Sequence, residues 1–378
     1  PRVGLLIDTS TGFGREALQG IAEYIRTINK WSCTLGPGRA DQFPEGMRRW
    51  EGDGMIVTVR GPSLLKPLRA KGLPTVNLTH ELPDIGMPQV LSDDVRVGQL
   101  AAEHFADRGL RQFGYFGLRQ AEYCRMRSES FHRHAESLSR ACHILPRLNW
   151  KHEDWPRFRR VASEWITSVP KPIGVLAADD VLARTLVEVC HSLELRVPDD
   201  VSVVGVDNDP VFCSLVDPPL SSIDPDARRR GYEAAALLDK LMNGQSPPEE
   251  PIRLAPRALI ARGSSDLVAS ADPDVAEALR FIRDNAHKPI TVADVARAAT
   301  ISRRALEMRF KDQLDRLPGA ELRRVRLERA QSLLVDTELD LKQIAARTGL
   351  PNSKSLCEMF RRVVGTTPMT FRKRFGNS

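Results

Sequence analysis

Over the first 262 residues, short apolar runs alternate with longer amphipathic stretches. The apolar runs predict strands at 3–8, 54–59, 74–78, 113–117, 173–178, 201–206 and 253–259. Between them, apolar residues recur at helical spacing over 14–28, 95–107, 128–138, 181–193 and 226–242. Continuous apolar strands separated by such helices are typical of parallel sheets that helices cover on both faces. The pattern therefore predicts a doubly wound α/β structure over residues 1–262.

This α/β region is long for one hydrophobic core, which predicts two lobes with a cleft between them. The helix that begins at Asp93 and Asp94 and leads to 111–113 is the predicted first crossing between the lobes. The stretch 207–222, rich in Pro and Asp, is the predicted return. Each lobe would then be assembled from separate parts of the chain.

After the α/β region the pattern becomes purely helical. Residues 263–271 are polar, contain glycine and are too short to fold alone, so they are the predicted linker. Asp272-Pro273 is expected to open a helix that runs to about Ala286, and Thr291 with Asp294 forms an N-terminal capping signal. Residues 272–378 are therefore predicted to form an all-α domain.

One motif occurs twice in this helical domain. A short apolar-periodic helix, a turn and an arginine-bearing helix follow one another at 292–314 and again at 341–364. The spacing Leu306, Phe310, Pro318 in the first copy recurs as Leu356, Phe360, Pro368 in the second. This is the form of a helix-turn-helix, whose second helix fits the major groove of DNA. Two packed helical hairpins without DNA contact would explain the apolar spacing, but not the arginines at the starts of the outer helices.

The polar faces of the two outer helices supply the predicted DNA contacts. In the first copy Thr300-Ile301 is the predicted turn and Ser302 the cap, and in the second Gly349 makes the turn and Asn352 or Ser353 the cap. Arginine at a helix start can pair with guanine edges or with phosphates. The expected DNA-binding residues are Ser302, Arg303, Arg304, Glu307, Lys311, Asn352, Ser353, Lys354, Ser355, Glu358, Arg361 and Arg362.

A linking helix is predicted between the two copies, over about 319–335. Its apolar residues face inward, and four arginines are expected outside: Arg323, Arg324, Arg326 and Arg329. Sixteen helical residues span about 24 Å, close enough to the repeat of the DNA groove, about 34 Å, for two recognition helices to enter successive major grooves.

The charge distribution agrees with DNA binding by the helical domain. The chain carries 55 Lys and Arg against 49 Asp and Glu, a net charge of +6. Residues 266–378 hold 21 of the basic and 15 of the acidic residues, so the entire excess lies there. A basic surface suits phosphate binding because each neutralised phosphate releases condensed counterions.

Two segments of the helical domain resemble the AraC-type transcription factors. They are Ile-Ser-Arg-Arg-Ala-Leu-Glu-Met-Arg-Phe-Lys at 301–311 and Phe-Arg-Arg-Val-Val-Gly-Thr-Thr-Pro-Met-Thr-Phe-Arg at 360–372, with Gly-Thr-Thr-Pro at 365–368 as the most specific part. One departure is Thr300, where the first turn of the family often has glycine. A less relaxed turn is expected at that position.

Carboxylates follow three of the predicted strands: Asp8, the pair Asp179 and Asp180, and Asp207 with Asn208 and Asp209. Strand ends at a cleft are where open α/β sheets bind ligands. Sugar hydroxyls donate to carboxylates, and an aromatic ring such as Phe13 covers the C–H face of a sugar. The same aspartates could instead cap the helices that follow them. Three sets at equivalent strand ends favour a polyol site.

The α/β region resembles the ligand-binding part of LacI-type repressors and periplasmic sugar-binding proteins. The resemblance lies in Val-Val-Gly-Val-Asp-Asn at 203–208, Ala-Asp-Asp at 178–180 and Arg-Ser-Glu-Ser-Phe at 127–131, where Ser130 replaces a glycine. It implies a two-lobed sensor with parallel sheets and helices on both faces. The residues that the combined prediction places at the ligand are Asp8, Phe13, Arg15, Arg127, Asp179, Asp180, Asp207 and Asn208.

A LacI-type sensor followed by an AraC-type DNA-binding domain resembles regulators of pentose operons over essentially the full 378 residues. The resemblance implies a sugar-responsive transcription activator, with a pentose, D-xylose first, as effector and double-stranded operator DNA as partner. A homodimer and contact with RNA polymerase are further expectations. No run of about 18 apolar residues predicts a membrane span, and no charged leader precedes the first strand, so a cytoplasmic location is expected.

An enzyme is the main alternative, either sugar-processing or nucleotide-binding. Gly12-Phe-Gly14 follows the first strand, as in a dinucleotide-binding loop, but Ala17 stands at the third glycine position and no acidic residue follows at the right distance. A simple sugar carrier is a third alternative, but a carrier would have no need of the basic helical domain. The six cysteines have no metal-ligand spacing, so neither a metal nor a cofactor is expected.

Overall fold

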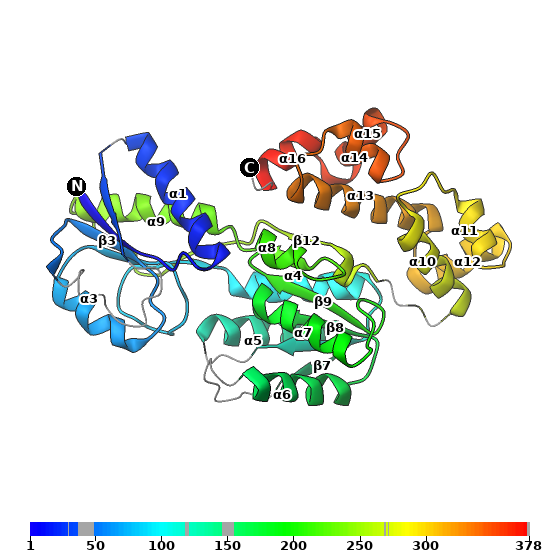
Figure 1. Cartoon of the computed structure of the whole chain (residues 1–378), viewed down its shortest axis with the longest axis horizontal. Coiled ribbons are helices and arrows are strands. Elements are labelled where there is room, and N and C mark those ends of the chain that lie inside the picture. The colour runs from blue at the N-terminus through cyan, green and yellow to red at the C-terminus, as the bar shows by residue number, and fades with distance from the viewer. Residues whose placement is uncertain are drawn as a thin grey trace.

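The computed structural model describes residues 1–28, 30–36, 49–117, 121–145, 155–267, 270 and 272–375. They form two α/β lobes followed by a helical domain (Figure 1). The predicted α/β architecture and the predicted all-α domain are both confirmed. No helix of the described residues is long and apolar enough to cross a membrane.

The first lobe is built on a parallel sheet with the strand order β2-β1-β3-β4. Its strands are β1 (Arg2–Leu6), β2 (Ser32–Leu35), β3 (Gly54–Val57) and β4 (Thr75–Asn77). Helices α1 (Gly12–Ile28) and α9 (Ala227–Met242) pack closely, and the missing side chain of Gly20 makes this possible. A Cβ added there would lie 1.8 Å from the carbonyl oxygen of Arg228. Helix α3 (Leu65–Lys71) and a two-stranded pair, β5 (Val90–Ser92) with β11 (Ile252–Leu254), complete this lobe.

The second lobe has a six-stranded sheet with the order β12-β10-β9-β8-β6-β7. Its strands are β6 (Gln112–Phe116), β7 (Ala141–Ile144), β8 (Ile173–Ala177), β9 (Val201–Val206), β10 (Ser221–Asp224) and β12 (Ala258–Ile260), of which only β12 runs antiparallel to its neighbour. Helices cover both faces: α4 (Asp94–Asp107), α5 (Glu122–Ser137), α6 (Trp155–Ser168), α7 (Asp180–Ser192) and the short α8 (Pro210–Ser214).

The chain passes between the lobes three times, whereas the sequence predicted two crossings. The first, at Asp93 and Asp94, is where it was expected. The predicted return at 207–222 is wrong, because α8 and β10 stay in the second lobe and the chain returns only after Asp224, where α9 begins. The predicted strand 253–259 is two strands, and the third crossing lies between β11 and β12. Proline at 256 interrupts the run, since it cannot donate to a sheet.

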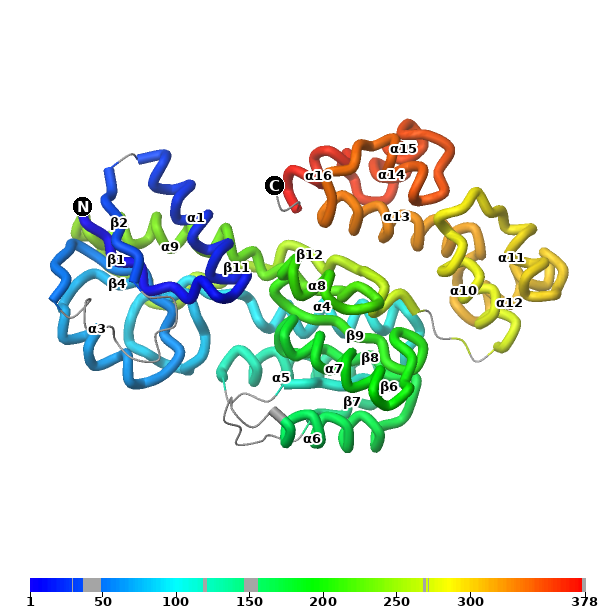
Figure 2. The backbone as a smooth tube through the Cα atoms, viewed as in Figure 1, coloured from blue at the N-terminus to red at the C-terminus, as the bar shows by residue number. Residues whose placement is uncertain are grey.

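The helical domain contains α10 (Pro273–Asn285), α11 (Val292–Ala298), α12 (Arg303–Leu314), α13 (Pro318–Asp336), α14 (Leu341–Arg347), α15 (Ser353–Val364) and α16 (Pro368–Phe375). Asp272 caps α10, and Thr291 with Asp294 forms the predicted capping box of α11. Helix α13 runs alongside the second lobe, with α10, α11 and α12 near its first end and α14, α15 and α16 near its last (Figure 2). Of the predicted linker, 263–267 and 270 are described, and Ser264 and Ser265 are fully buried.

Candidate functional site

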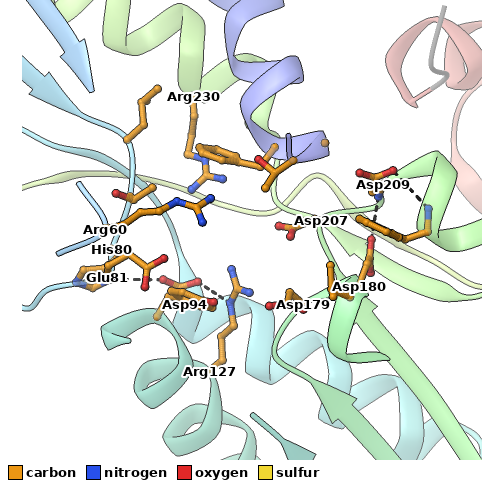
Figure 3. A pocket seen from close by; sticks show the side chains of 18 residues that line it. Arg60, His80, Glu81, Asp94, Arg127, Asp179, Asp180, Asp207, Asp209 and Arg230 are labelled. Atoms are coloured by element: carbon orange, nitrogen blue, oxygen red, sulfur yellow. Dashed lines mark hydrogen bonds and ion pairs between the residues drawn. The ribbon is translucent and has the colours of Figure 1, made fainter. Parts of the chain in front are cut away.

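A cavity of about 150 Å³ lies between the two lobes (Figure 3). The loops after β1, β3 and β4 and helices α1 and α9 line it from the first lobe, and the N-terminal parts of α4, α5, α7 and α8 and the loop after β9 line it from the second. The ends of parallel strands therefore meet at the cleft, as expected for an open α/β sheet. Its acidic, basic and histidine lining residues are Arg60, His80, Glu81, Asp94, Arg127, Asp179, Asp180, Asp207, Asp209 and Arg230.

Five of the eight predicted ligand residues line this cleft: Phe13, Arg127, Asp179, Asp180 and Asp207. They come from α1, α5, α7 and the end of β9, so the fold brings together residues that are up to 194 positions apart in the sequence. The strand-end rule therefore identified much of one wall, that of the second lobe.

Asp8, Arg15 and Asn208 are not among the residues that line the cavity, and their polar atoms contact other residues of the protein. Asp8 is buried, lies 2.9 Å from an Arg60 nitrogen and accepts a hydrogen bond from the Ser10 hydroxyl. Arg15 reaches Asp209 at 3.3 Å. The Asn208 amide oxygen accepts from Arg262 at 2.9 Å. These three side chains support the cleft and do not line it.

Asp179 and Asp180 are adjacent but have different surroundings. Asp179 caps α7 by accepting from the Leu182 amide at 2.8 Å, so the helix-cap explanation holds for this residue. Asp180 is 1% exposed and accepts from the Ser222 hydroxyl at 2.6 Å and from the Asp209 amide at 2.8 Å. Burial raises the pKa of Asp180 well above its usual range. It therefore connects the cleft to β10 and to the loop after β9.

Asp207 lies in the cleft with an unusual backbone. Its φ is 118° and that of Asn208 is 50°, conformations that are costly for residues with a Cβ and that often mark functional sites. Burial raises the pKa of Asp207 to about 7, against the opposing effect of the Arg127 charge. No hydrogen bond from the described residues reaches its carboxylate, which leaves it open to a ligand hydroxyl.

Arg127 and Asp94 form a buried ion pair at the floor of the cleft. The Arg127 Nε donates to Asp94 at 2.8 Å, and its Nη1 donates to the Ala178 carbonyl at 2.6 Å. The guanidinium also lies 4.8 Å from the centre of the Tyr123 ring. Burial alone would raise the pKa of Asp94, but the Arg127 charge lowers it, so the carboxylate is ionised. The pair fixes the Arg127 donors toward the cleft.

Sequence reasoning missed several lining residues, including Arg60, His80, Asp94 and Arg230. Arg60 and Asp94 follow β3 and β5, so the rule used for the aspartates would have found them if it had been extended to every strand. Arg230 lies inside α9, which was predicted only as an amphipathic helix. Nothing in the neighbouring sequence indicates that this arginine lines the cleft.

The lobes touch each other across the cleft. The amide of Tyr123 donates to the His80 carbonyl at 2.9 Å, and that of Glu122 donates to the Glu81 carbonyl at 3.1 Å. On the other side Gly12 lies against Asp209, where an added Cβ would fall 2.3 Å from a carboxylate oxygen. Residues of both lobes therefore line the same cavity.

In the helical domain both copies of the motif have the predicted form. Ser302 caps α12 by accepting from the Ala305 amide, and Asn352, rather than Ser353, caps α15 by accepting from the Ser355 amide. Thr300 turns with φ 57° and Gly349 with φ 68°, so both turns are left-handed. Because Thr300 has a Cβ, the left-handed conformation is sterically unfavourable for it, whereas glycine avoids this cost. The first turn is therefore less relaxed, as expected.

The predicted DNA-binding residues lie on exposed or half-exposed faces of α12 and α15 and on the turns before them. Arg303 is 67% exposed in its side chain and pairs with Glu307 at 2.8 Å, and Lys311 pairs with Asp315. Arg304, Lys354, Arg361 and Arg362 are exposed and have no ion pair within the described part of the chain. Both recognition helices therefore present free cations to solvent.

Only two of the four predicted outer arginines of α13, Arg323 and Arg329, are exposed. Arg324 pairs with Glu321 and Glu328 and reaches Asp266 of the linker. Arg326 donates to the carbonyls of Ala286, Lys288 and Ile290, the segment that joins α10 to α11. The prediction that all four arginines lie outside is wrong for Arg324 and Arg326, because helical spacing does not reveal which polar residues meet another part of the fold.

Helix α13 is attached to the second lobe along its length. Arg108 of α4 pairs with Glu328 at 2.7 Å. Nearer the end of α13, Arg262 makes a two-pronged pair with Asp336, at 2.7 and 2.6 Å. Arg262 also donates to Asn208 and to the Leu220 carbonyl. The same guanidinium thus joins the loop after β9 to the DNA-binding domain.

Comparisons with known proteins agree with both parts of this architecture. A periplasmic binding protein-like domain matches residues 102–265, and a helix-turn-helix domain matches residues 295–374. The chain is 28% identical to the xylose operon regulatory protein of Escherichia coli K12, over 98% of this chain and 96% of that one. It is 27% identical to the xylose operon regulatory protein of Haemophilus influenzae, over 98% of each chain.

The solved structure of a xylose-binding transcription activator is similar over the whole chain, with a TM-score of 0.68, 27% identity and coverage of 100% of this chain and 98% of that one. A ribose-bound LacI family regulator from Enterococcus faecium shares the sensor fold, with a TM-score of 0.58 over 71% of this chain and 100% of that one. These similar proteins are transcription regulators, so the predicted enzyme alternative is set aside. The chain is therefore similar over nearly its whole length to the xylose operon regulatory proteins, and it joins a periplasmic binding protein-like domain to a helix-turn-helix domain of the AraC type.

Proposed function

We propose that this chain is a transcription activator that binds a pentose in the interlobe cleft, with D-xylose as the leading candidate. It would bind operator DNA through α12 and α15. Residues 1–262 would form the sensor, 263–271 the connection and 272–378 the DNA-binding domain. The names of the relatives, which concern xylose, support the choice of pentose. The observation that carries the proposal is the cleft itself, where both lobes present polar side chains to one small cavity.

The chemistry of the cleft suits a polyol. Asp179 and Asp207 offer carboxylate oxygens as acceptors, Arg127 offers donors, and Phe13 offers an apolar ring. Sugar hydroxyls both donate and accept, so one sugar can satisfy all of these groups. A ligand that bridges the lobes favours their closed arrangement over the open one, and it shifts the population by its difference in affinity for the two.

A chain of hydrogen bonds supports coupling between the cleft and the DNA-binding domain. Asp180 in the cleft holds the Ser222 hydroxyl, which accepts from the Asn208 amide at 3.0 Å. Asn208 in turn accepts from Arg262, the partner of Asp336 at the end of α13. A shift of the loop after β9 on sugar binding would therefore move the end of α13, from which the chain continues into α14 and α15.

DNA recognition is proposed to use both exposed helices. The helix that joins the two copies, α13, has 19 residues. At 1.5 Å per residue it spans about 28 Å, which is compatible with recognition helices in successive major grooves, about 34 Å apart. Arg303 and Arg304 would contact bases or phosphates from the start of α12, and the polar residues of α15 would contact the next groove.

We also propose that the protein acts as a homodimer in the cytoplasm and that RNA polymerase is a partner at the promoter. Paired half-sites in the operator would reflect the twofold symmetry of such a dimer. Sedimentation with and without operator DNA measures this, and a monomer on a single half-site would contradict the dimer.

The test of the proposed function measures DNA affinity with and without D-xylose at fixed salt. The DNA is a duplex that the full-length protein selects from a library of random sequences. D-Xylose is expected to change the affinity or the preferred spacing of half-sites, and Asp179→Asn to abolish this response while DNA binding without sugar persists. Equal affinity and equal spacing with and without D-xylose, L-arabinose and D-ribose would refute the sugar response.

Matched arginines test the DNA contacts. Arg304→Ala should weaken operator binding about 10- to 100-fold, equivalent to about 1–3 kcal/mol for a base contact. Arg297 is the control, because it is exposed on the support helix α11 and pairs with Asp294. Arg297→Ala should change affinity less than threefold, and equal losses in the two variants would contradict the assigned groove-facing helix.

A further inference from the structure

Arg230 is a buried arginine without a polar partner. It lies in α9, lines the cleft and is only 7% exposed. Its Nε has no hydrogen-bond partner, and no hydrogen bond or ion pair from the described residues reaches any of its side-chain nitrogens. The Phe13 ring, 4.2 Å from the guanidinium carbon, is its one close side-chain interaction among those described. Figure 3 shows the guanidinium directed toward the centre of the cleft.

The other two arginines of the cleft differ from Arg230 in this respect. Arg60 pairs with Asp8 at 2.9 Å, and Arg127 pairs with Asp94 at 2.8 Å and also donates to a carbonyl. Their charges are therefore compensated by carboxylates of the protein. Arg230 keeps five unused N–H donors in a fixed fork.

A buried cation without an acceptor is unfavourable, because its lost hydration is not replaced. Contact with an aromatic face offsets this cost only in part. Burial lowers the pKa of Arg230 to about 10, so the group remains charged at neutral pH. A molecule in the cleft that presents oxygen atoms to Arg230 would supply the missing acceptor.

The charge of the cleft indicates what kind of acceptor this is. Its lining holds six carboxyl groups, Glu81, Asp94, Asp179, Asp180, Asp207 and Asp209, against three guanidinium groups, Arg60, Arg127 and Arg230. Burial raises the pKa of Asp180 well above its usual range, but the other five carboxyl groups still outnumber the three cations. An anionic ligand would add to this excess of negative charge, whereas a neutral sugar would not. The fork of an arginine also matches two neighbouring oxygens.

We propose that Arg230 is a ligand-binding residue that donates to two adjacent oxygens of a neutral sugar, while the carboxylates that line the cleft disfavour sugar acids. This inference rests on the proposed function, since it takes the cleft to be a sugar site. Arg230 would hold the ligand from the first lobe, opposite the carboxylates of Asp179 and Asp207 on the second.

Calorimetry on the full chain tests the assignment, with D-xylose and D-xylonate as probes. Arg230→Met keeps the length and apolar character of the side chain but removes the donors. It should weaken D-xylose binding about 10- to 100-fold, as expected for hydrogen bonds from a charged group. The matched control is Arg228→Met, two residues earlier on the same helix, where the arginine pairs with Glu23 away from the cleft and the affinity should not change.

Thermal unfolding without sugar separates ligand binding from a structural role. Removing an unpaired buried charge should leave Tm unchanged or raise it. A lower Tm with unchanged D-xylose affinity would overturn the assignment. Arg230→Lys provides a second measurement if Arg230→Met does not fold, since lysine keeps the charge but not the fork, and affinity equal to that of the wild type would overturn the two-oxygen contact.

The outcomes also distinguish this inference from the proposed function. Wild-type binding of D-xylose that Arg230→Met leaves intact would overturn the role of Arg230 alone. Tighter wild-type binding of D-xylonate than of D-xylose would overturn the preference for a neutral ligand. A wild-type chain that binds no sugar of either kind would overturn the proposed function and the Arg230 assignment together.

Discussion

The two helix-turn-helix copies have the same sequence pattern but are attached to the sensor differently. The core of the first copy draws its buried residues from the helical domain alone, with Val275, Ile282, Val295, Leu306 and Phe310 among them. The core of the second copy also contains Ile260, a residue of the last sensor strand that is only 2% exposed. The second copy is therefore packed as an extension of the second lobe.

Polar contacts repeat this difference. At the first copy, Arg283 pairs with Asp199 at 2.6 Å, and both side chains are one-fifth exposed. At the second copy, Asp336 is 29% exposed, but the Arg262 side chain that it holds is only 3% exposed and also binds the loop after β9. Partly exposed ion pairs contribute little, whereas leaving a buried cation without its carboxylate is costly. A change in the sensor should therefore reach the second copy first and the first copy through α13.

The largest expected effect comes from removing Asp336. Asp336→Ala would leave the buried Arg262 guanidinium without its carboxylate, and the free energy of unfolding should fall by about 3–5 kcal/mol. Urea denaturation measures it. The control is Glu338→Ala, an exposed acidic residue two positions later, which should stay within about 0.5 kcal/mol of the wild type. Equal and small effects would mean that the second copy is not held by this pair.

Ile260→Ala tests the shared core of the second copy. Deleting this buried side chain should cost about 2–4 kcal/mol and should also reduce the sugar response of operator binding. Ile282→Ala, in the core of the first copy, should cost a similar amount and leave the sugar response in place. A sugar response that survives Ile260→Ala but not Ile282→Ala would reverse the proposed order of coupling.

The smallest effects concern the two turns and have opposite signs. Thr300→Gly should stabilise the first copy by about 1 kcal/mol, because glycine accepts the left-handed backbone without a steric penalty. Gly349→Ala should destabilise the second copy by more than that, since its Cβ would also lie 2.3 Å from the Ala286 carbonyl oxygen. Thermal unfolding of both variants checks the signs, and a loss of stability in Thr300→Gly would contradict strain at Thr300.

The local elements of the DNA-binding domain were predictable because their signals are local. The Leu, Phe and Pro spacing located both recognition helices, and the caps at Asp272, Thr291 and Ser302 were found from adjacent residues. Edge and short strands of the sensor were missed, among them β2 and β7, which carry little apolar alternation.

The cleft was predictable in part. Arg127, Asp179, Asp180 and Asp207 carry motifs or follow strands, and all four line it. Arg230 does not follow a strand, and it reaches the cleft only because the chain returns to the first lobe at Asp226 and packs α9 against α1. That return was predicted too early, so no reading of local spacing could have placed this residue.

The amino-acid sequence by itself determined the order of the two parts, the periodicity of their helices and strands, and the basic excess of the DNA-binding domain, because each depends on residues that are near neighbours in the chain. Only the tertiary structure decided which polar side chains are free. Arg230 faces the cleft without a partner, whereas Arg262 and Arg324 are used between domains. The physical reason is that burial and pairing depend on residues brought together from distant parts of the chain, and these settle whether a charge binds a ligand or holds the fold.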